Sequence, residues 1–166
     1  MNEQNNIISI KQDAIFTACI QTYDNFYTFP KHMHQNAEMY FVTNGSCSMY
    51  IKDEKITLKE NDFIIIFPHV LHSLFLENAD ECKFYHIHFD LEELSSLQIE
   101  LKDYSFTIEN LQLHLLLQKN FLLYRHDLKI KSLIENIVTE HNSNTPYSKI
   151  ISNLNLIELI IKIISI

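Results

Sequence analysis

The chain has 166 residues, of which 46% are hydrophobic, and it carries a formal net charge of -8. This length and composition fit one globular domain, or one domain with a helical appendage. The excess of acidic residues argues against direct binding to nucleic acid, because phosphate groups are neutralised by clustered Lys and Arg side chains. Any contact with DNA would have to come from another part of the protein.

The cysteines and the terminal sequences indicate the cellular compartment in which we expect the protein. Cys19, Cys47 and Cys82 are odd in number and widely spaced, so they indicate neither a disulfide framework nor a zinc site. The N-terminus lacks the basic region and apolar run of a secretory signal. The apolar C-terminal stretch is interrupted by Lys162 and is too short to cross a bilayer. We therefore expect a reduced, cytoplasmic protein with no membrane segment.

The first half of the chain is predicted to be β. Short apolar or alternating runs, separated by polar turn residues, occur at 14–23, 39–43, 46–52, 55–58, 63–67, 71–77 and 82–89. Asn44-Gly45, between the second and third runs, is the dipeptide best suited to a tight hairpin. Strands at this regular spacing predict a sandwich or a closed barrel.

The periodicity becomes helical in the second half. A first helix is predicted to begin with Thr107 as its N-cap. One face of this helix is formed by Leu111, Leu115, Gln118 and Leu122. A second helix is expected over 128–140, and a third from Thr145-Pro146 to the end of the chain. The third is too apolar to stand alone in water and needs a partner surface. We also expect the native chain to continue beyond Ile166.

Two histidines and a glutamate stand close together before a predicted strand: His32, His34 and Glu38. Residues two apart in an extended segment project to the same face, and Glu38 can join the two imidazoles across a short turn. Three metal-capable groups would then share one side of the sheet. The pattern leaves open whether they bind a metal, a small organic ligand, or nothing.

The spacing His32-x-His34-x-x-x-Glu38-x-x-x-x-x-x-Gly45 resembles the first motif of the cupin family, and residues 61–72 fall where the second cupin motif should lie. The chain departs from these motifs where Phe26, Asn61 and His69 replace glycines and Phe67 replaces a proline. His72, the histidine of the second motif that matters for a metal, is retained.

A cupin half that ends in Tyr85-His-Ile-His-Phe-Asp90 and precedes Leu- and Ile-rich helices resembles, more narrowly, the N-terminal effector-binding and dimerisation half of AraC-type transcriptional regulators. The resemblance implies a mainly β fold with added helices. A cupin-like double-stranded β-helix, or jelly-roll barrel, would occupy residues 1–90. A helical dimerisation region and linker would occupy 91–166, and a helix-turn-helix domain would follow after residue 166.

With His72 added, the cluster becomes a set of three histidines and one carboxylate, chemically suited to Zn, Ni, Mn or Fe. The alternative is that these are inherited barrel positions, satisfied by hydrogen bonds or by an organic effector. On the regulator interpretation no cofactor is required, and a divalent metal at His32, His34, Glu38 and His72 stays an open alternative.

Strand alternation adds further candidates for an effector pocket. Tyr40 follows Glu38 onto the inner face, and Leu74 follows His72. The last strand of the barrel lines the pocket in the family that the chain resembles, which adds His86. The predicted ligand-binding residues are His32, His34, Glu38, Tyr40, His72, Leu74 and His86.

The leading hypothesis is a ligand-sensing and dimerisation domain of a cytoplasmic AraC-type regulator, which is not an enzyme and has no catalytic residues. A small-molecule effector would bind in the barrel, the C-terminal helices would form a homodimer, and DNA would be bound only by a domain outside this chain. The alternative is a free-standing metal-dependent cupin enzyme, a dioxygenase or isomerase, that uses His32, His34, Glu38 and His72. A third hypothesis is an interaction module with an empty barrel.

Overall fold

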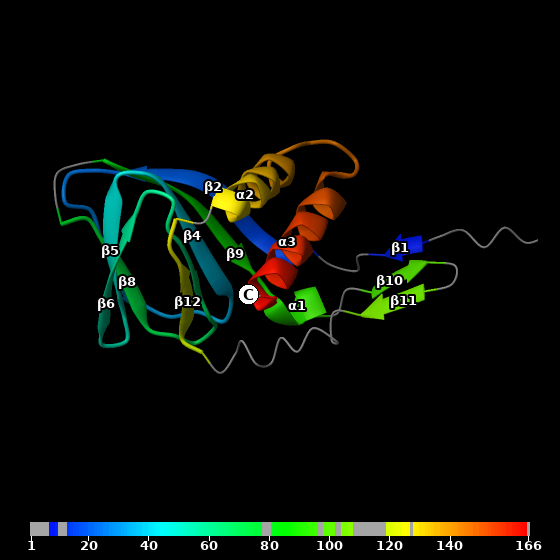
Figure 1. The fold of residues 1–166 in the computed structure, drawn as a ribbon, viewed down its shortest axis with the longest axis horizontal. Helices are drawn as coiled ribbons and strands as arrows, with labels where there is room; N and C mark the ends of the chain where they lie inside the picture. The colour runs from blue at the N-terminus through cyan, green and yellow to red at the C-terminus, as the bar shows by residue number, and fades with distance from the viewer. Residues whose placement is uncertain are drawn as a thin grey trace, which may run out of the picture.

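Two antiparallel sheets face each other to form a barrel, and helices pack on its outside (Figure 1). The structure is a computed structural model that describes residues 7–9, 13–77, 81–95, 98–101, 104–107, 119–126 and 128–165. The larger sheet has the order β12 (Phe121–Tyr124), β7 (Phe63–Ile66), β4 (Ala37–Asn44), β9 (Cys82–Phe89) and β2 (Ile15–Tyr23). The smaller has the order β3 (Thr28–His32), β8 (His72–Phe75), β5 (Ser46–Ile51) and β6 (Glu54–Lys59). This is the jelly-roll barrel that the sequence predicted.

The strands predicted for the first half of the chain are all present. Alternating segments such as β6 bury every second residue, whereas all four residues of β7 are buried, as its unbroken apolar run predicts. The predicted strand over 82–89 has the same bounds as β9. Asn44-Gly45 joins β4 to β5, but these two strands lie in different sheets and do not pair, so the predicted hairpin is wrong and the turn instead carries the chain from one sheet to the other. Gly45 has a φ of 76°. A side chain at Gly45 would also collide with the carbonyl oxygen of Glu81, 2.2 Å from an added Cβ.

The second half contains strands as well as helices, so the first predicted helix is wrong at its C-terminal end. Thr107, the expected N-cap, closes strand β11 (Tyr104–Thr107), which pairs with β10 (Gln98–Leu101) and through it with β1 (Ile7–Ser9). Leu122 lies in β12, which pairs with β7. Leu111, Leu115 and Gln118 lie outside the described residues.

The physical reason for this error lies in β12. The run Phe121–Tyr124 is short and apolar, and a short apolar run fits a strand as well as a helix by periodicity alone. In the fold it covers the edge of the fully buried strand β7, which would otherwise expose unpaired backbone groups. The region predicted as helical thus supplies a strand to the barrel itself.

The remaining helices are α1 (Leu91–Ser95), α2 (Leu128–His141) and α3 (Ser148–Ile164). The second predicted helix corresponds to α2. The third begins at Ser148, after Thr145-Pro146, and the Ser148 hydroxyl donates to the carbonyl oxygen of Thr145 at 2.9 Å. Among the described helices, none combines the length and the apolar character needed to cross a membrane.

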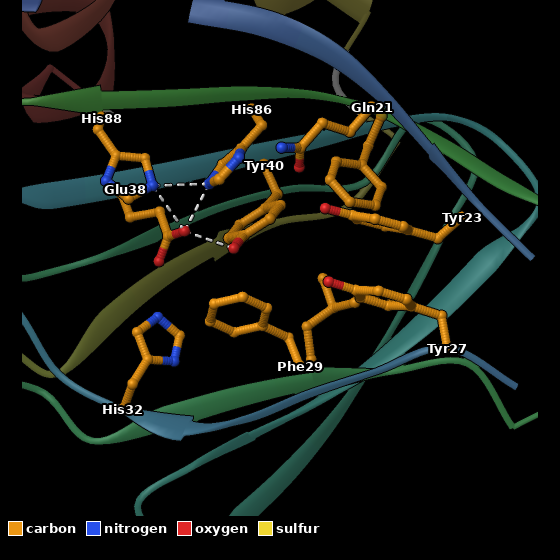
Figure 2. Close-up of a pocket in the computed structure, with 11 residues that line it drawn as sticks. Gln21, Tyr23, Tyr27, Phe29, His32, Glu38, Tyr40, His86 and His88 are labelled. Carbon is orange, nitrogen blue, oxygen red and sulfur yellow. Dashed lines mark hydrogen bonds and ion pairs between the residues drawn. The ribbon is translucent and has the colours of Figure 1, made fainter. Parts of the chain in front are cut away.

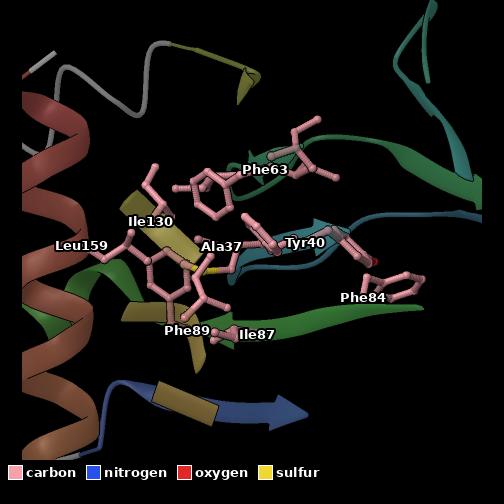
Figure 3. Packing of buried hydrophobic residues seen from close by; sticks show 14 of the residues in the cluster. Ala37, Tyr40, Phe63, Phe84, Ile87, Phe89, Ile130 and Leu159 are labelled. Carbon is pink, nitrogen blue, oxygen red and sulfur yellow. The ribbon is translucent and has the colours of Figure 1, made fainter. Parts of the chain in front are cut away.

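One continuous apolar cluster joins the helices to the barrel. Figure 3 shows it running from Leu159 of α3 and Ile130 of α2, past Phe89, towards Phe84. Leu159, Ile130 and Phe89 are each at most 1% exposed. Helix α2 lies against β2 and β9. The apolar face of the third predicted helix therefore has its partner surface within the chain itself.

Polar contacts also tie the edge strand β2 to the helices. Asn153 of α3 is fully buried, and its Oδ1 accepts a hydrogen bond from the backbone N–H of Ala14 at 3.1 Å. At the end of α2, Asn142 donates to the carbonyl oxygen of Ala18 at 2.7 Å. These bonds satisfy one backbone group just before β2 and one within it, and in the part of the chain that the structure describes β2 has a sheet partner on one side only.

Candidate functional site

Glu38 is the centre of a cluster of five histidines that come from both sheets of the barrel. Strand register places Glu38 opposite His88 and Tyr40 opposite His86, so these four side chains share the inner face of the larger sheet. His32 and His72 lie opposite each other in the smaller sheet. The fifth histidine, His34, lies in the loop after β3, where its backbone carbonyl accepts a hydrogen bond from the N–H of His69 at 2.8 Å.

The two carboxylate oxygens of Glu38 face different partners. Oε1 accepts a hydrogen bond from the Tyr40 hydroxyl at 2.5 Å, and it lies 2.5 Å from Nε2 of His86 and 2.9 Å from Nε2 of His88. Oε2 lies 3.2 Å from Nε2 of His34 and 2.7 Å from Nε2 of His72. Glu38 is only 1% exposed, so these groups replace its water shell.

The electrostatics of the cluster favour an ionised Glu38. Burial alone would raise the pKa of this carboxyl, but its contacts with His34, His72, His86 and His88 hold the pKa well below its usual range. The contact with Glu38 raises the pKa of His34. Burial lowers the pKa values of His32 and His86, and for His86 the nearby carboxylate opposes this effect.

A cavity of about 240 Å³ opens beside the cluster. Figure 2 shows Glu38, His86 and His88 at one end and Tyr23 and Tyr27 at the other, with both phenol hydroxyls pointing inward. The rings of Tyr23 and Tyr27 stack in parallel, with their centroids 3.7 Å apart. The remaining lining residues are Gln21, Phe29, His32, Tyr40, Leu74 and Phe84. A mostly aromatic cavity with polar groups gathered at one end is typical of a small-molecule site.

Comparison with known families settles the relationship of the chain. The family model described as the AraC-like ligand binding domain matches residues 15–160. The chain belongs to this family. A search of curated proteins finds no match.

Solved structures place this AraC-like domain beside ToxT of Vibrio cholerae strain SCE256. Apo ToxT K231A is 16% identical with a TM-score of 0.59, and the match covers 92% of this chain and 57% of that one. Wild-type ToxT with a bound unsaturated fatty acid is 18% identical with a TM-score of 0.57, covering 96% of this chain and 54% of that one. The cupin domain of Schizosaccharomyces pombe Cnp3 is 14% identical with a TM-score of 0.44, covering 48% of this chain and 59% of that one.

The two ToxT matches show a shared fold. The AraC-like domain spans little more than half of the ToxT chains it matches.

The seven residues predicted from the sequence do come together in this AraC-like domain. His32, Glu38, Tyr40, Leu74 and His86 line the cavity. His34 and His72 contact Glu38 from the other side of the carboxylate.

Several residues of the site were missed at the sequence level. His88 and Phe84 follow the same strand alternation as His86, which was the available signal for both. Gln21 and Tyr23 lie on β2, and their place in the cavity depends on the pairing of β2 with β9. Tyr27 and Phe29 flank the start of β3 in a part of the chain with no helical or alternating polar pattern.

In the predicted metal set, the hydrogen bonds of the histidines leave the Nε2 atoms available to bind a metal ion. Backbone carbonyl oxygens lie 3.0, 2.9 and 2.8 Å from the Nδ1 atoms of His32, His34 and His72. A carbonyl can only accept, so each Nδ1 carries a proton, and whenever one of these rings is neutral its lone pair is on Nε2. Metal-bound histidines are held by their other ring nitrogen in this way.

Within this set, the surroundings of His72 give the strongest indication of a metal-binding position. Its Nε2 is buried and lies 2.7 Å from Oε2 of Glu38, yet the contact does not have hydrogen-bond geometry. A lone pair and a carboxylate oxygen at this distance repel each other unless a positive charge lies between them. One donor atom from each of His32, His34, Glu38 and His72 lies within 4.8 Å of every other. We call these four residues the cupin set.

Proposed function

We propose that this chain is the ligand-sensing and dimerisation domain of a cytoplasmic AraC-type transcriptional regulator, and that it binds a small-molecule effector in the barrel cavity. The observation that carries the proposal is the aromatic cavity, closed at one end by the Glu38 cluster. Cavities for drug-sized ligands measure roughly 300–1,000 Å³. A cavity of about 240 Å³ therefore favours an effector smaller than a typical drug.

The effector would act through the helices. The strands β2 and β9 carry cavity residues on one face and contact α2 on the other. An effector that binds better to one arrangement of these strands would shift the population of helix positions, and thereby the spacing of two DNA-binding domains in a homodimer. Those domains would lie outside this acidic chain.

The test is a thermal-shift screen of metal-free protein in a chelating buffer, with small aromatic acids, sugars and unsaturated fatty acids as probes. The last group is included because one is bound to ToxT. A ligand that binds only the folded state raises its stability by RT ln(1 + [L]/Kd). A hit should be lost when Leu74→Trp fills the cavity, whereas Leu71→Trp, at an exposed position, should keep it.

A hit that survives Leu74→Trp would place the effector elsewhere. No hit in the wild-type protein over a broad library would argue for the interaction module with an empty barrel.

The second candidate function is a metal-dependent cupin enzyme, and the proton positions of His32, His34 and His72 favour it. A bound ion would supply a Lewis acid beside the cavity. Elemental analysis of purified protein separates the two candidates. A near-stoichiometric first-row metal that is lost in His34→Ala would favour the enzyme, and a metal-free, stably folded protein would exclude it.

A further inference from the structure

We propose that Glu38, His86 and His88 form a second position for a divalent transition-metal ion, on the cavity wall and distinct from the position of the cupin set. We call these three residues the cavity triad. The inference rests on the proposed function only in taking the cavity as the binding site, and it does not depend on which effector binds there.

The first argument is a count of protons. Nε2 of His86 and Nε2 of His88 lie 2.9 Å apart, and each lies within 2.9 Å of Oε1 of Glu38 (Figure 2). Hydrogen bonds from both nitrogens to the carboxylate would leave two N–H groups facing each other. A hydrogen bond between the nitrogens would instead leave one lone pair facing the carboxylate. No placement of protons satisfies all three contacts.

A single cation above the plane of this triangle would instead accept a lone pair from each of the three atoms. Bonds from a divalent first-row metal ion to imidazole nitrogen or carboxylate oxygen are about 2.0–2.2 Å long. In a facial set of two histidines and one carboxylate, neighbouring ligands at right angles therefore lie roughly 2.9 Å apart. The nitrogen-to-nitrogen distance and one of the two nitrogen-to-oxygen distances in the triad have this value.

The chemistry of the triad also suits a metal. Two histidines and one carboxylate that leave other coordination positions open form a known binding set for first-row metals. All three side chains line the cavity. The open positions would therefore face the effector, and an oxygen-bearing ligand such as a carboxylate could complete the shell.

The two positions are separate because Glu38 divides its oxygens between them. Oε1 faces the triad, and Oε2 faces His34 and His72. One carboxylate carries a single negative charge, so two dications that share it repel each other. We expect the second ion to bind at least tenfold more weakly than the first.

The experiment counts metal ions on the whole chain. Protein stripped with a chelator is dialysed against Zn²⁺, and bound zinc is measured by elemental analysis at increasing free concentration. His86→Ala/His88→Ala removes the triad, and His32→Ala/His34→Ala removes two partly exposed members of the cupin set. His141→Ala, on α2 and outside both groups, is the matched control.

The wild type and His141→Ala should each bind two ions per chain, and each double variant should bind one. Binding of Co²⁺ to His32→Ala/His34→Ala should produce a visible absorption band that further substitution of His86 abolishes. If the alanine pair at 86 and 88 does not fold, as judged by circular dichroism, His86→Gln/His88→Gln replaces it.

A wild-type protein that binds one ion or none would overturn the second position, as would two ions retained without the triad histidines. Neither result bears on effector binding, because the effector screen is run without metal.

Discussion

At the scale of the residue, three replacements in the cupin motifs change the side chain but keep a backbone conformation that glycine normally adopts. Phe26, Asn61 and His69 stand where the family has glycine, and their φ angles are 60°, 67° and 62°. All three adopt the left-handed conformation that glycine adopts without cost. The turns of the motif are therefore kept, although the residues that normally allow them are absent. Phe26 is the least suited of the three, because asparagine and histidine tolerate this region better.

Phe26→Gly should stabilise the protein. The left-handed conformation costs a non-glycine residue about 1–2 kcal/mol. Glycine loses about 0.5–1 kcal/mol more backbone entropy on folding than alanine does. Because the Phe26 side chain is 63% exposed, little packing is lost, and a net gain of about 0.5–1 kcal/mol is expected.

Phe16→Gly is the matched control for this prediction, at a similarly exposed position in β2. It should destabilise the protein, because glycine is unfavourable within a strand. Urea unfolding midpoints of the two variants measure both effects. A loss of stability in Phe26→Gly equal to that in Phe16→Gly would contradict the account of strain.

Tyr23 should make the stability of the domain depend on alkaline pH. Burial, with a contribution from the neighbouring Tyr27, raises the pKa of Tyr23 to about 12. The folded state thus holds the phenol proton more tightly than the unfolded state, in which the pKa is about 10. This contribution to stability is complete below pH ~10 and is lost as the pH rises towards 12. Urea unfolding at pH 9, 10 and 11 should show a smaller loss for Tyr23→Phe than for the wild type, and parallel losses would refute the assignment.

At the scale of the element, the sequence predicts the strands and helices that local patterns determine. It does not predict those that depend on residues far away in the chain. Apolar runs bounded by turn residues predicted β9 to the residue, and helical periodicity predicted α2 to within one residue. The same rules failed at β12, whose state is decided by the open edge of β7, more than fifty residues earlier.

The residues of the site also fall into those that a local pattern predicts and those that depend on strand pairing. Glu38 and Tyr40 follow from alternation within one strand. Alternation also puts His88 on the same face as His86, but the contact of His88 with Glu38 depends on the register of β4 against β9, which no local pattern encodes.

The hydrogen bond from Ala14, just before β2, to Asn153 of α3 should contribute to the stability of the fold. Replacing this buried side chain by alanine leaves the N–H of Ala14 without its acceptor, and an unsatisfied buried group costs about 1–3 kcal/mol. Asn155→Ala is the control on the same helix, since the Asn155 side chain donates to the carbonyl oxygen of Ile151 one turn earlier within α3. Thermal unfolding should separate the variants by several degrees. Hydrogen exchange at the Ala14 amide should accelerate only in Asn153→Ala. Equal exchange rates in both variants would show that this hydrogen bond does not contribute to stability.

At the scale of the whole molecule, the barrel and the helices form one connected unit. Strand β9 carries His86 and His88 towards the cavity, while Tyr85, on its opposite face, donates to Glu135 of α2 at 3.3 Å. Strand β2 brings Tyr23 to the cavity, and Ala14, just before its other end, is held by Asn153 of α3. A change at the cavity can therefore reach both helices through two strands. This is a physical route, and coupling along it is measurable as a shift in dimer affinity on effector binding.

The proposed homodimer should form through α3 and not through α2. The outer side of α3 keeps apolar side chains in water, with Ile151 39% and Ile164 36% exposed, and Tyr147 just before it is 67% exposed. Thr139 represents the outer side of α2, which is mostly polar. Burying an apolar side chain at an interface contributes about 1.5–3 kcal/mol, and a charge placed there removes this gain and must be desolvated.

Ile151→Glu should therefore raise the dimer dissociation constant at least tenfold in sedimentation velocity experiments over a range of concentrations. Thr139→Glu adds the same charge to α2 and should leave the constant within twofold of the wild type. Weakening by Thr139→Glu alone would move the interface to α2. A wild-type protein that stays monomeric at the highest concentration would remove the dimer from the proposal, and the effector would then have to act on the DNA-binding domains by another route.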